Sequence, residues 1–190
     1  MSDAAKPRNI PVMMVRSDLG GFPQPPMPVG YSTRLWRPGD DETWVRIERE
    51  SDRFNDITRA VFEREFGYDL AAMAGRGLFL VGPDGEDVGT ATAWYGDEKL
   101  GRDWGRIHWV AIVPAHQGKG LAKPMLAAAM RRLAASHSKA YLWTSSARIP
   151  AIKVYLDFGF RPEMTADKAG DGWREVRAKL KHRSLETLGL

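Results

Sequence analysis

The stretch that decides the fold is Val110–Ala122, which reads V-A-I-V-P-A-H-Q-G-K-G-L-A. Its first residues are apolar and mostly β-branched, as in a buried strand that ends at Pro114. A turn with Gly118 and Gly120 leads into a segment whose apolar residues recur every three or four positions. These residues form one helical stripe: Leu121, Met125, Leu126, Ala129, Met130 and Leu133. The segment therefore predicts a strand, a glycine-rich turn and an amphipathic helix that faces a sheet.

This arrangement is suited to binding a phosphate group. The first N–H groups of a helix have no intrahelical acceptor, and they carry partial positive charge. Gly118 and Gly120 let a ligand approach the backbone without a Cβ in the way, and Lys119 and Lys123 add charge. A Walker loop and a dinucleotide fingerprint both fit poorly, because Lys119 is followed by glycine and position 123 is lysine. The alternative is a strand, turn and helix that bind no ligand.

On both sides of this stretch the chain alternates between strand and helix patterns. The expected order is β-α-α-β-β-β-α-β-α-β, which indicates an α/β fold built on a mixed sheet. The expected strands are Tyr31–Arg37, Leu78–Val81, Val88–Tyr95, Arg106–Val113, Ala140–Thr144 and Gly172–Leu180. The expected helices begin at Asp40 or Asp41, at Asp56, at the glycine-rich turn and at Pro150, and Gly67 ends the second of them.

Length and proline content predict one domain preceded by an arm. The chain has 190 residues, and six of its 12 prolines precede residue 30. Proline fixes φ and removes a hydrogen-bond donor, so we expect residues 1–30 to form a Pro-rich extended N-terminal arm. Residues 31–190 are expected to form a single domain. Three alternatives stay open for the arm: packing across the domain, reaching a neighbouring subunit in a homodimer, or mobility.

Composition excludes several classes of function. With Cys at 0, disulfides, thiolate metal sites and a cysteine nucleophile are excluded, and the four histidines lack metal-ligand spacing, so we expect no metal. The net charge of +4 is spread along the chain, which argues against a nucleic-acid partner. Apolar stretches are too short to span a membrane, and no secretory signal is visible. We therefore expect a cytoplasmic protein with no membrane partner.

Two segments carry a resemblance to a known family. Gln117–Ala122 resembles the Q/R-x-x-G-x-G/A loop of the GNAT superfamily of N-acetyltransferases, and Ala151–Phe160 resembles the family's A-x-x-x-Y-x-x-x-G-F segment. The element order from Tyr31 to Leu180 also fits. The resemblance implies a GNAT-like mixed, mostly antiparallel central sheet of six to seven strands, flanked by about four helices and splayed at strands four and five.

The resemblance also implies a reaction. The expected function is an N-acyltransferase that moves an acetyl group from acetyl-CoA to a primary amine by direct attack in a ternary complex. The alternative is a non-catalytic CoA- or acyl-CoA-binding module that senses or recruits. The absence of Cys and of a G-x-S-x-G elbow argues against an acyl-enzyme.

Residue roles follow from the matched motifs. The resemblance implies that pantetheine pairs with the strand edge at Val110, Ala111 and Ile112, where a backbone N–H also polarises the thioester carbonyl. It implies that the pyrophosphate lies on Gln117, Gly118, Lys119, Gly120, Leu121, Ala122 and Lys123. Tyr155 would protonate the departing CoA thiolate. The alternative for Tyr155 is packing against the sheet.

The chain departs from the family pattern in two places. Arg148 stands where many members have Asn, and Arg106 stands where some have a carboxylate base. His108, two residues further on, is a candidate base, acting directly or through water. The alternative for His108 is a partly buried strand histidine with a satisfied hydrogen bond.

The acceptor is expected at the break between the first two helices. There Asp52 and Asp56 would attract the ammonium group of a small molecule or a side chain, and Phe54 would offer an apolar wall. The alternative is a solvated pair of helices whose interleaved acidic and basic side chains form weak ion pairs.

Overall fold

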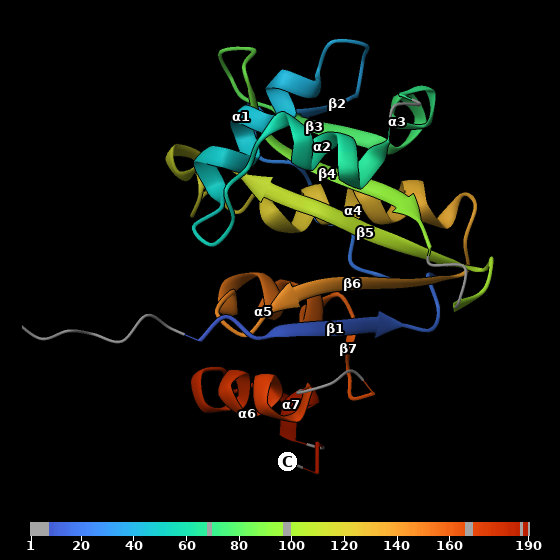
Figure 1. The fold of residues 1–190 in the computed structure, drawn as a ribbon, viewed down its shortest axis with the longest axis vertical. Helices are drawn as coiled ribbons and strands as arrows, with labels where there is room; N and C mark the ends of the chain where they lie inside the picture. Colours follow the sequence, from blue (N-terminus) through green and yellow to red (C-terminus); the bar gives the residue numbers. More distant parts are fainter. Residues whose placement is uncertain (1–7, 68–69, 97–99, 166–168, 187, 190) are drawn as a thin grey trace, which may run out of the picture. The chain divides into compact units, whose positions relative to one another are not determined.

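The computed structural model describes residues 8–67, 70–96, 100–165, 169–186 and 188–189. The chain forms two compact units. The larger unit is Asp18–Ala140, and the smaller unit combines Met1–Ser17 with Tyr141–Leu190. Figure 1 labels the strands and helices that make up each unit.

The larger unit contains four strands in the order β2-β3-β4-β5, and each neighbouring pair is antiparallel. The expected hairpin is confirmed, since Leu78 lies opposite Ala91 across β3 and β4. The strands are β2 (Ser32–Leu35), β3 (Gly77–Val81), β4 (Asp87–Tyr95) and β5 (Trp104–Ile112). The helices are α1 (Asp41–Ser51), α2 (Arg59–Phe66), α3 (Ala71–Arg76) and α4 (Ala122–Ala134).

Helices cover both faces of β5. A Cβ placed on Gly105 would meet Leu133 of α4 at 2.6 Å, whereas the ring of His108 lies 5.6 Å from that of Phe66 on α2. Positions 105 and 108 point to opposite faces of a strand, so α2 and α4 pack on opposite sides. The predicted apolar stripe of α4, from Leu121 to Leu133, is buried at every position, which confirms the amphipathic helix. Its burial supplies the core on that face.

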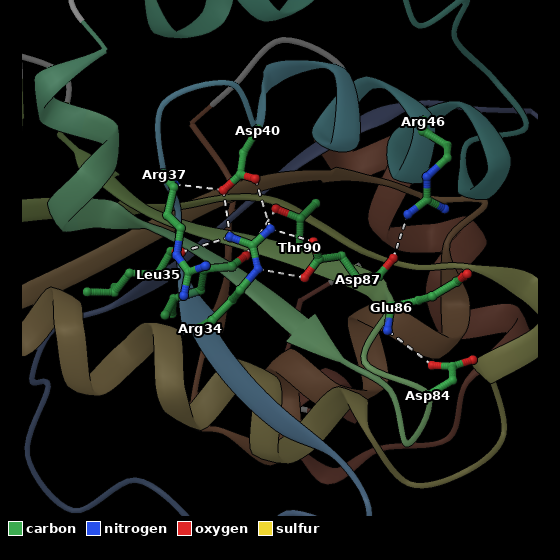
Figure 2. A network of polar contacts seen from close by, with 10 residues as sticks. Arg34, Leu35, Arg37, Asp40, Arg46, Asp84, Glu86, Asp87 and Thr90 are labelled. Carbon is green, nitrogen blue, oxygen red and sulfur yellow. Dashed lines mark hydrogen bonds and ion pairs between the residues drawn. The ribbon is translucent and has the colours of Figure 1, made fainter.

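A guanidinium fixes β2 to the start of α1 and to β4 (Figure 2). Nη1 of Arg34 donates to Oδ2 of Asp40 at 2.6 Å, and its Nε donates to Oδ1 of Asp87 at 2.8 Å. Arg46 of α1 donates to the Asp87 carbonyl at 2.6 Å. Burial tends to raise the pKa of Asp40, but the hydrogen bonds from Arg34 and the Arg37 backbone lower it overall. These bonds hold the turn before α1 in place.

The smaller unit contains strands in the order β6-β1-β7. Strand β1 lies inside the range expected to be an arm, and it pairs antiparallel with β7. The strands are β6 (Lys139–Ser145, in this unit from Tyr141), β1 (Pro11–Arg16) and β7 (Arg161–Glu163). The helices are α5 (Ile149–Asp157), α6 (Ala169–Lys179) and α7 (Arg183–Glu186).

The prediction of a last strand at Gly172–Leu180 is wrong, because these residues belong mostly to helix α6. Its buried residues are Ala169, Gly172, Trp173 and Val176, which recur at the helical spacing of three and four rather than at every second position. Residues 166–168, just before this helix, lie outside the described part of the chain.

The predicted fold class is confirmed: the described residues form a mixed α/β structure with seven mostly antiparallel strands. They contain seven α-helices, where about four were expected. The predicted splay concerns β5 and β6, which belong to different units, so it stays a prediction. The division at residue 30 also stays a prediction. No helix of the described chain is long and apolar enough to cross a membrane.

Candidate functional site

The glycine-rich turn has the backbone shape that the sequence indicated. After β5 a short 3-10 turn (Pro114–His116) leads through Gly118, with φ of 75°, and Gly120, with φ of 77°. A Cβ on either glycine would meet no atom within 4 Å, so the positive φ, and not lack of space, requires glycine here. Leu121 is buried and anchors the end of the turn. The open space beside both glycines leaves room for a ligand.

The start of α4 presents backbone donors next to this turn. The N–H of Met125 makes the first helical bond, to the carbonyl of Leu121 at 3.1 Å. The N–H groups that precede it in the helix have no intrahelical acceptor, and Pro124 has no N–H to lose. The first turn of α4 carries no acidic residue, and the Lys119 and Lys123 side chains are exposed. The helix start is therefore electropositive.

The end of β5 turns a backbone donor away from its neighbour strand. Val113 donates its N–H to the carbonyl of Val88 at 2.9 Å, and Ile112 lies opposite Gly89. Because N–H groups alternate in direction along an antiparallel strand, the N–H and C=O of Ile112 point away from β4. The side chain of Gln117 donates to that Ile112 carbonyl at 2.8 Å. Gln117 thus ties the loop to the strand.

A bulge interrupts β5 just before this edge. Thr90 pairs with Ala111 and Thr92 with His108, so Trp109 and Val110 together oppose one residue of β4. Trp109 has φ of 47°, the only positive φ at a non-glycine residue of the described chain. Such a conformation is costly for a large side chain and persists only where neighbouring contacts hold it. Here the bulge redirects the strand at the predicted pantetheine edge.

His108 lies beneath α2 in contact with a carboxylate that the sequence reasoning missed. Its side chain is 7% exposed, and its Nε2 lies 3.1 Å from Oε2 of Glu65. The indole Nε1 of Trp109 donates to the same oxygen at 3.3 Å, and Arg64 contacts the other oxygen at 3.2 Å. Both features of the alternative role for His108, burial and a satisfied hydrogen bond, are present. Its role as a base stays a prediction.

The pKa values of both titratable groups, His108 and Glu65, are far from their ordinary values. Burial lowers the pKa of His108 to about 4, since desolvation outweighs the attraction of Glu65. Hydrogen bonding from His108, with further bonds from Trp109 and Arg64, lowers the pKa of Glu65 to about 2. At neutral pH the pair is therefore a neutral imidazole that donates to an ionised carboxylate.

No signal in one sequence could have paired Glu65 with His108. The two residues are 43 positions apart, and Glu65 sits in a helix rich in charged residues. One local feature sets it apart: it immediately precedes the buried Phe66, so it lies at the border of the apolar face of α2.

Tyr155 lies on α5 in the smaller unit, with a side chain 8% exposed. Its ring packs edge-on against Phe160 at a centroid distance of 6.0 Å. Arg148 is the residue that precedes α5. Tyr155 belongs to the smaller unit and the predicted cofactor loop to the larger one. The role of Tyr155 as the acid that protonates the thiolate therefore stays a prediction.

The predicted acceptor residues lie in the loop between α1 and α2. Oδ1 of Asp52 accepts the backbone N–H groups of Phe54 at 2.7 Å and Asn55 at 3.1 Å, and Oδ2 accepts the Asn55 side chain. Asp52 therefore closes the turn that ends α1. The side chains of Phe54 and Asp56 are exposed. Acceptor binding by these three residues stays a prediction.

With this geometry in place, the comparisons with known proteins define the class. Residues 41–160 match the Acetyltransferase (GNAT) family. The chain belongs to this family, and the resemblance seen in its two motifs is confirmed.

Curated relatives include two proteins named mycothiol acetyltransferase. That of Streptomyces griseus is 28% identical over 142 residues, which are 72% of this chain and 45% of the relative. That of Streptomyces bingchenggensis is 30% identical over 151 residues, which are 73% of this chain and 46% of the relative. The chain thus spans about half the length of the curated relatives it matches.

Solved structures agree in fold. A GCN5-related N-acetyltransferase from Sphaerobacter thermophilus superposes with a TM-score of 0.66 at 19% identity, covering 82% of this chain and 49% of that one. A GNAT-family acetyltransferase from Colwellia psychrerythraea gives a TM-score of 0.63 at 12% identity, covering 82% and 53%.

Proposed function

We propose that the chain is an acetyl-CoA-dependent N-acetyltransferase that acts on a primary amine by direct attack in a ternary complex. One observation carries the proposal: the glycine turn at Gly118 and Gly120 opens onto the backbone N–H groups that start α4. Membership of the acetyltransferase family supports it. The alternative is a non-catalytic CoA-binding module. Such a module would bind the cofactor on the same loop but would not transfer its acetyl group.

The donor is proposed to bind along the loop and the strand edge that precedes it. The pyrophosphate lies against the backbone from Gln117 to Lys123, where the N–H groups and the two exposed lysines complement its charge. Pantetheine follows Val110–Ile112, and the N–H of Ile112, directed away from β4, donates to the thioester oxygen.

The reaction then needs two proton transfers. The lone pair of the amine nitrogen forms the C–N bond to the thioester carbon, and the C–S bond breaks with its electron pair on sulfur. His108 accepts the proton that the nitrogen loses, and Tyr155 donates a proton to the thiolate. Both roles are parts of the proposal.

The acceptor is proposed to be a small molecule or a side chain that bears a primary amine, bound near Asp52, Phe54 and Asp56. The curated relatives are named for mycothiol. Mycothiol-related amines therefore belong in the first set of acceptors to be tested.

A thermal shift experiment tests the donor site. Acetyl-CoA at about 100 times its Kd stabilises a protein that binds it only when folded by about 2.7 kcal/mol, which raises Tm. We expect this shift for the wild type and its loss in Gly120→Asp, whose carboxylate enters the anion site. Gly85→Asp is the matched control, because Gly85 also has positive φ (84°) with no atom near its Cβ, but lies in the β3–β4 turn. A folded Gly120→Asp protein with the full shift would overturn the site.

Turnover separates the enzyme from the binding module. Release of free thiol from acetyl-CoA is measured with a panel of amines that includes mycothiol-related compounds. Amine-dependent thiol release supports the enzyme, whereas a thermal shift with no release across the panel favours the module.

A further inference from the structure

We propose that Glu65 is a positioning residue for the reaction: it holds His108 in the Nε2–H tautomer and fastens Trp109 at the bulge of β5. The Nδ1 atom of His108 then carries the lone pair that takes the proton from the acceptor amine. The inference rests on the proposed function, because the role of His108 as the base belongs to that function.

The first argument is that one carboxylate oxygen joins two successive residues of a strand. Side chains at successive strand positions normally point to opposite faces. Here His108 Nε2 and Trp109 Nε1 lie 3.1 Å and 3.3 Å from the same Oε2 of Glu65. The positive φ of Trp109 breaks the alternation and turns both rings toward α2. Glu65 is therefore a contact that helps to hold the strained residue in place.

The second argument is the position of the charge on its helix. Glu65 lies in the last turn of α2, where the helix dipole disfavours an anion. Its carboxylate nevertheless stays ionised, because the imidazole, the indole and the Arg64 guanidinium all donate to it. These hydrogen bonds offset the unfavourable interaction with the helix dipole. A neutral glutamine at position 65 would lack the negative charge that they stabilise.

The third argument is chemical. Because burial keeps His108 neutral at physiological pH, only one of its ring nitrogens carries a proton. An ionised carboxylate can only accept a hydrogen bond, so Nε2 must be the protonated nitrogen and Nδ1 the base. When Nδ1 takes the amine proton, the imidazolium forms 3.1 Å from a negative charge. Glu65 stabilises that cation and does not itself take up the proton.

Aromatic rings cover the His108 side of this pair, whereas the Glu65 side chain is 21% exposed. The Phe66 ring lies 5.6 Å from the His108 ring, and Trp44 packs edge-on against Trp109 at 5.2 Å. In such surroundings the attraction between imidazolium and carboxylate is stronger than in bulk water. Glu65 is therefore expected to favour the imidazolium form of His108.

The tautomer is tested directly by NMR, without any acceptor. Protein labelled with ¹⁵N-histidine is recorded at pH 7 as wild type, Glu65→Gln and Glu63→Gln, and the His108 signals are assigned from a His108→Gln spectrum. Glu63 is the matched control, because it lies on the same helix and pairs with Arg59 at the surface. We expect protonated Nε2 and unprotonated Nδ1 in the wild type and in Glu63→Gln, and a mixed or reversed tautomer in Glu65→Gln. A protonated Nδ1 in the wild type, or an unchanged tautomer in Glu65→Gln, overturns the inference.

Kinetics then test the consequence for the reaction. With an amine that the wild type acetylates, we expect Glu65→Gln to lower kcat by about 10- to 1,000-fold. This loss is part of the roughly 10²–10⁴-fold rate increase that a general base contributes. The thermal shift with acetyl-CoA stays at its wild-type value. The acidic limb of the pH profile moves to lower pH, because Glu65 raises the pKa of His108. Glu65→Asp, which keeps the charge, restores part of the rate.

The two proposals fail in different ways. A wild-type protein with no acetyl-CoA shift and no thiol release refutes the proposed function, whatever the tautomer. Normal wild-type turnover with an unchanged rate and pH profile in folded Glu65→Gln refutes the role of Glu65 and leaves the function standing.

Discussion

Burial of His108 makes the stability of this protein fall on mild acidification. The native pKa of His108 is about 4, against an ordinary value of 6.5. Between these two values the unfolded chain binds a proton that the native protein does not bind. The contribution of His108 to the free energy of unfolding is therefore largest above pH 6.5, and it decreases as the pH falls from 6.5 toward 4.

The size of this loss follows from the two pKa values. The shift of the His108 pKa from 6.5 to about 4 corresponds to about 3 kcal/mol in total, of which about 2 kcal/mol is lost between pH 7.5 and pH 5.0. Solvent screening reduces this little, because the side chain is only 7% exposed. The pKa of Glu65 is lowered from 4.5 to about 2, so that group contributes mainly below pH 5. Burial also lowers the pKa of His137 below 6.5, so His108 is isolated only by comparison with a variant that lacks its imidazole.

Denaturant unfolding at pH 7.5 and pH 5.0, for wild type and His108→Gln, measures the effect. Glutamine carries no charge at either pH and can still donate to Glu65. We expect the wild type to lose about 2 kcal/mol more than the variant on acidification, whatever the absolute stability of the variant. Groups that titrate alike in both proteins cancel in the comparison. An equal loss in the two proteins would refute the buried, neutral histidine.

Three further predictions concern other parts of the molecule. Tyr155→Phe should lower kcat by about 10²–10⁴-fold with an unchanged acetyl-CoA thermal shift; a kcat within a few-fold of wild type would make Tyr155 structural. Asp52→Asn and Asp56→Asn should each raise the acceptor KM in steady-state kinetics; the Asp52→Asn side chain keeps an oxygen for the turn amides but loses the charge and the hydrogen bond from the Asn55 side chain. Unchanged KM in both variants would move the acceptor elsewhere. Arg34→Lys should lower the free energy of unfolding by about 1–3 kcal/mol, because one ammonium cannot replace the two-sided contacts to Asp40 and Asp87; no change on denaturant unfolding would contradict this.

Local sequence patterns were sufficient to predict most of the fold. The stripe of α4, the glycine turn and the β3–β4 hairpin depend on residues a few positions apart, and all three are confirmed. The error at α6 arose because the apolar residues of Gly172–Leu180 fit both patterns: Val176, Ala178 and Leu180 alternate, and Trp173, Val176 and Leu180 also recur at three and four positions. The buried Ala169, which completes the helical spacing, precedes this segment by three positions.

The sequence by itself determined the family, the glycine-rich turn and the strand and helix on either side of it, because each depends on short-range spacing. Tertiary structure alone decided how the candidate base is held. Glu65 and His108 are separated by 43 positions, and their side chains meet only because α2 packs on the face of β5 where the bulge turns Trp109. A contact of this kind depends on the packing of two elements and on one unusual backbone angle, and neither leaves a periodic pattern in the chain.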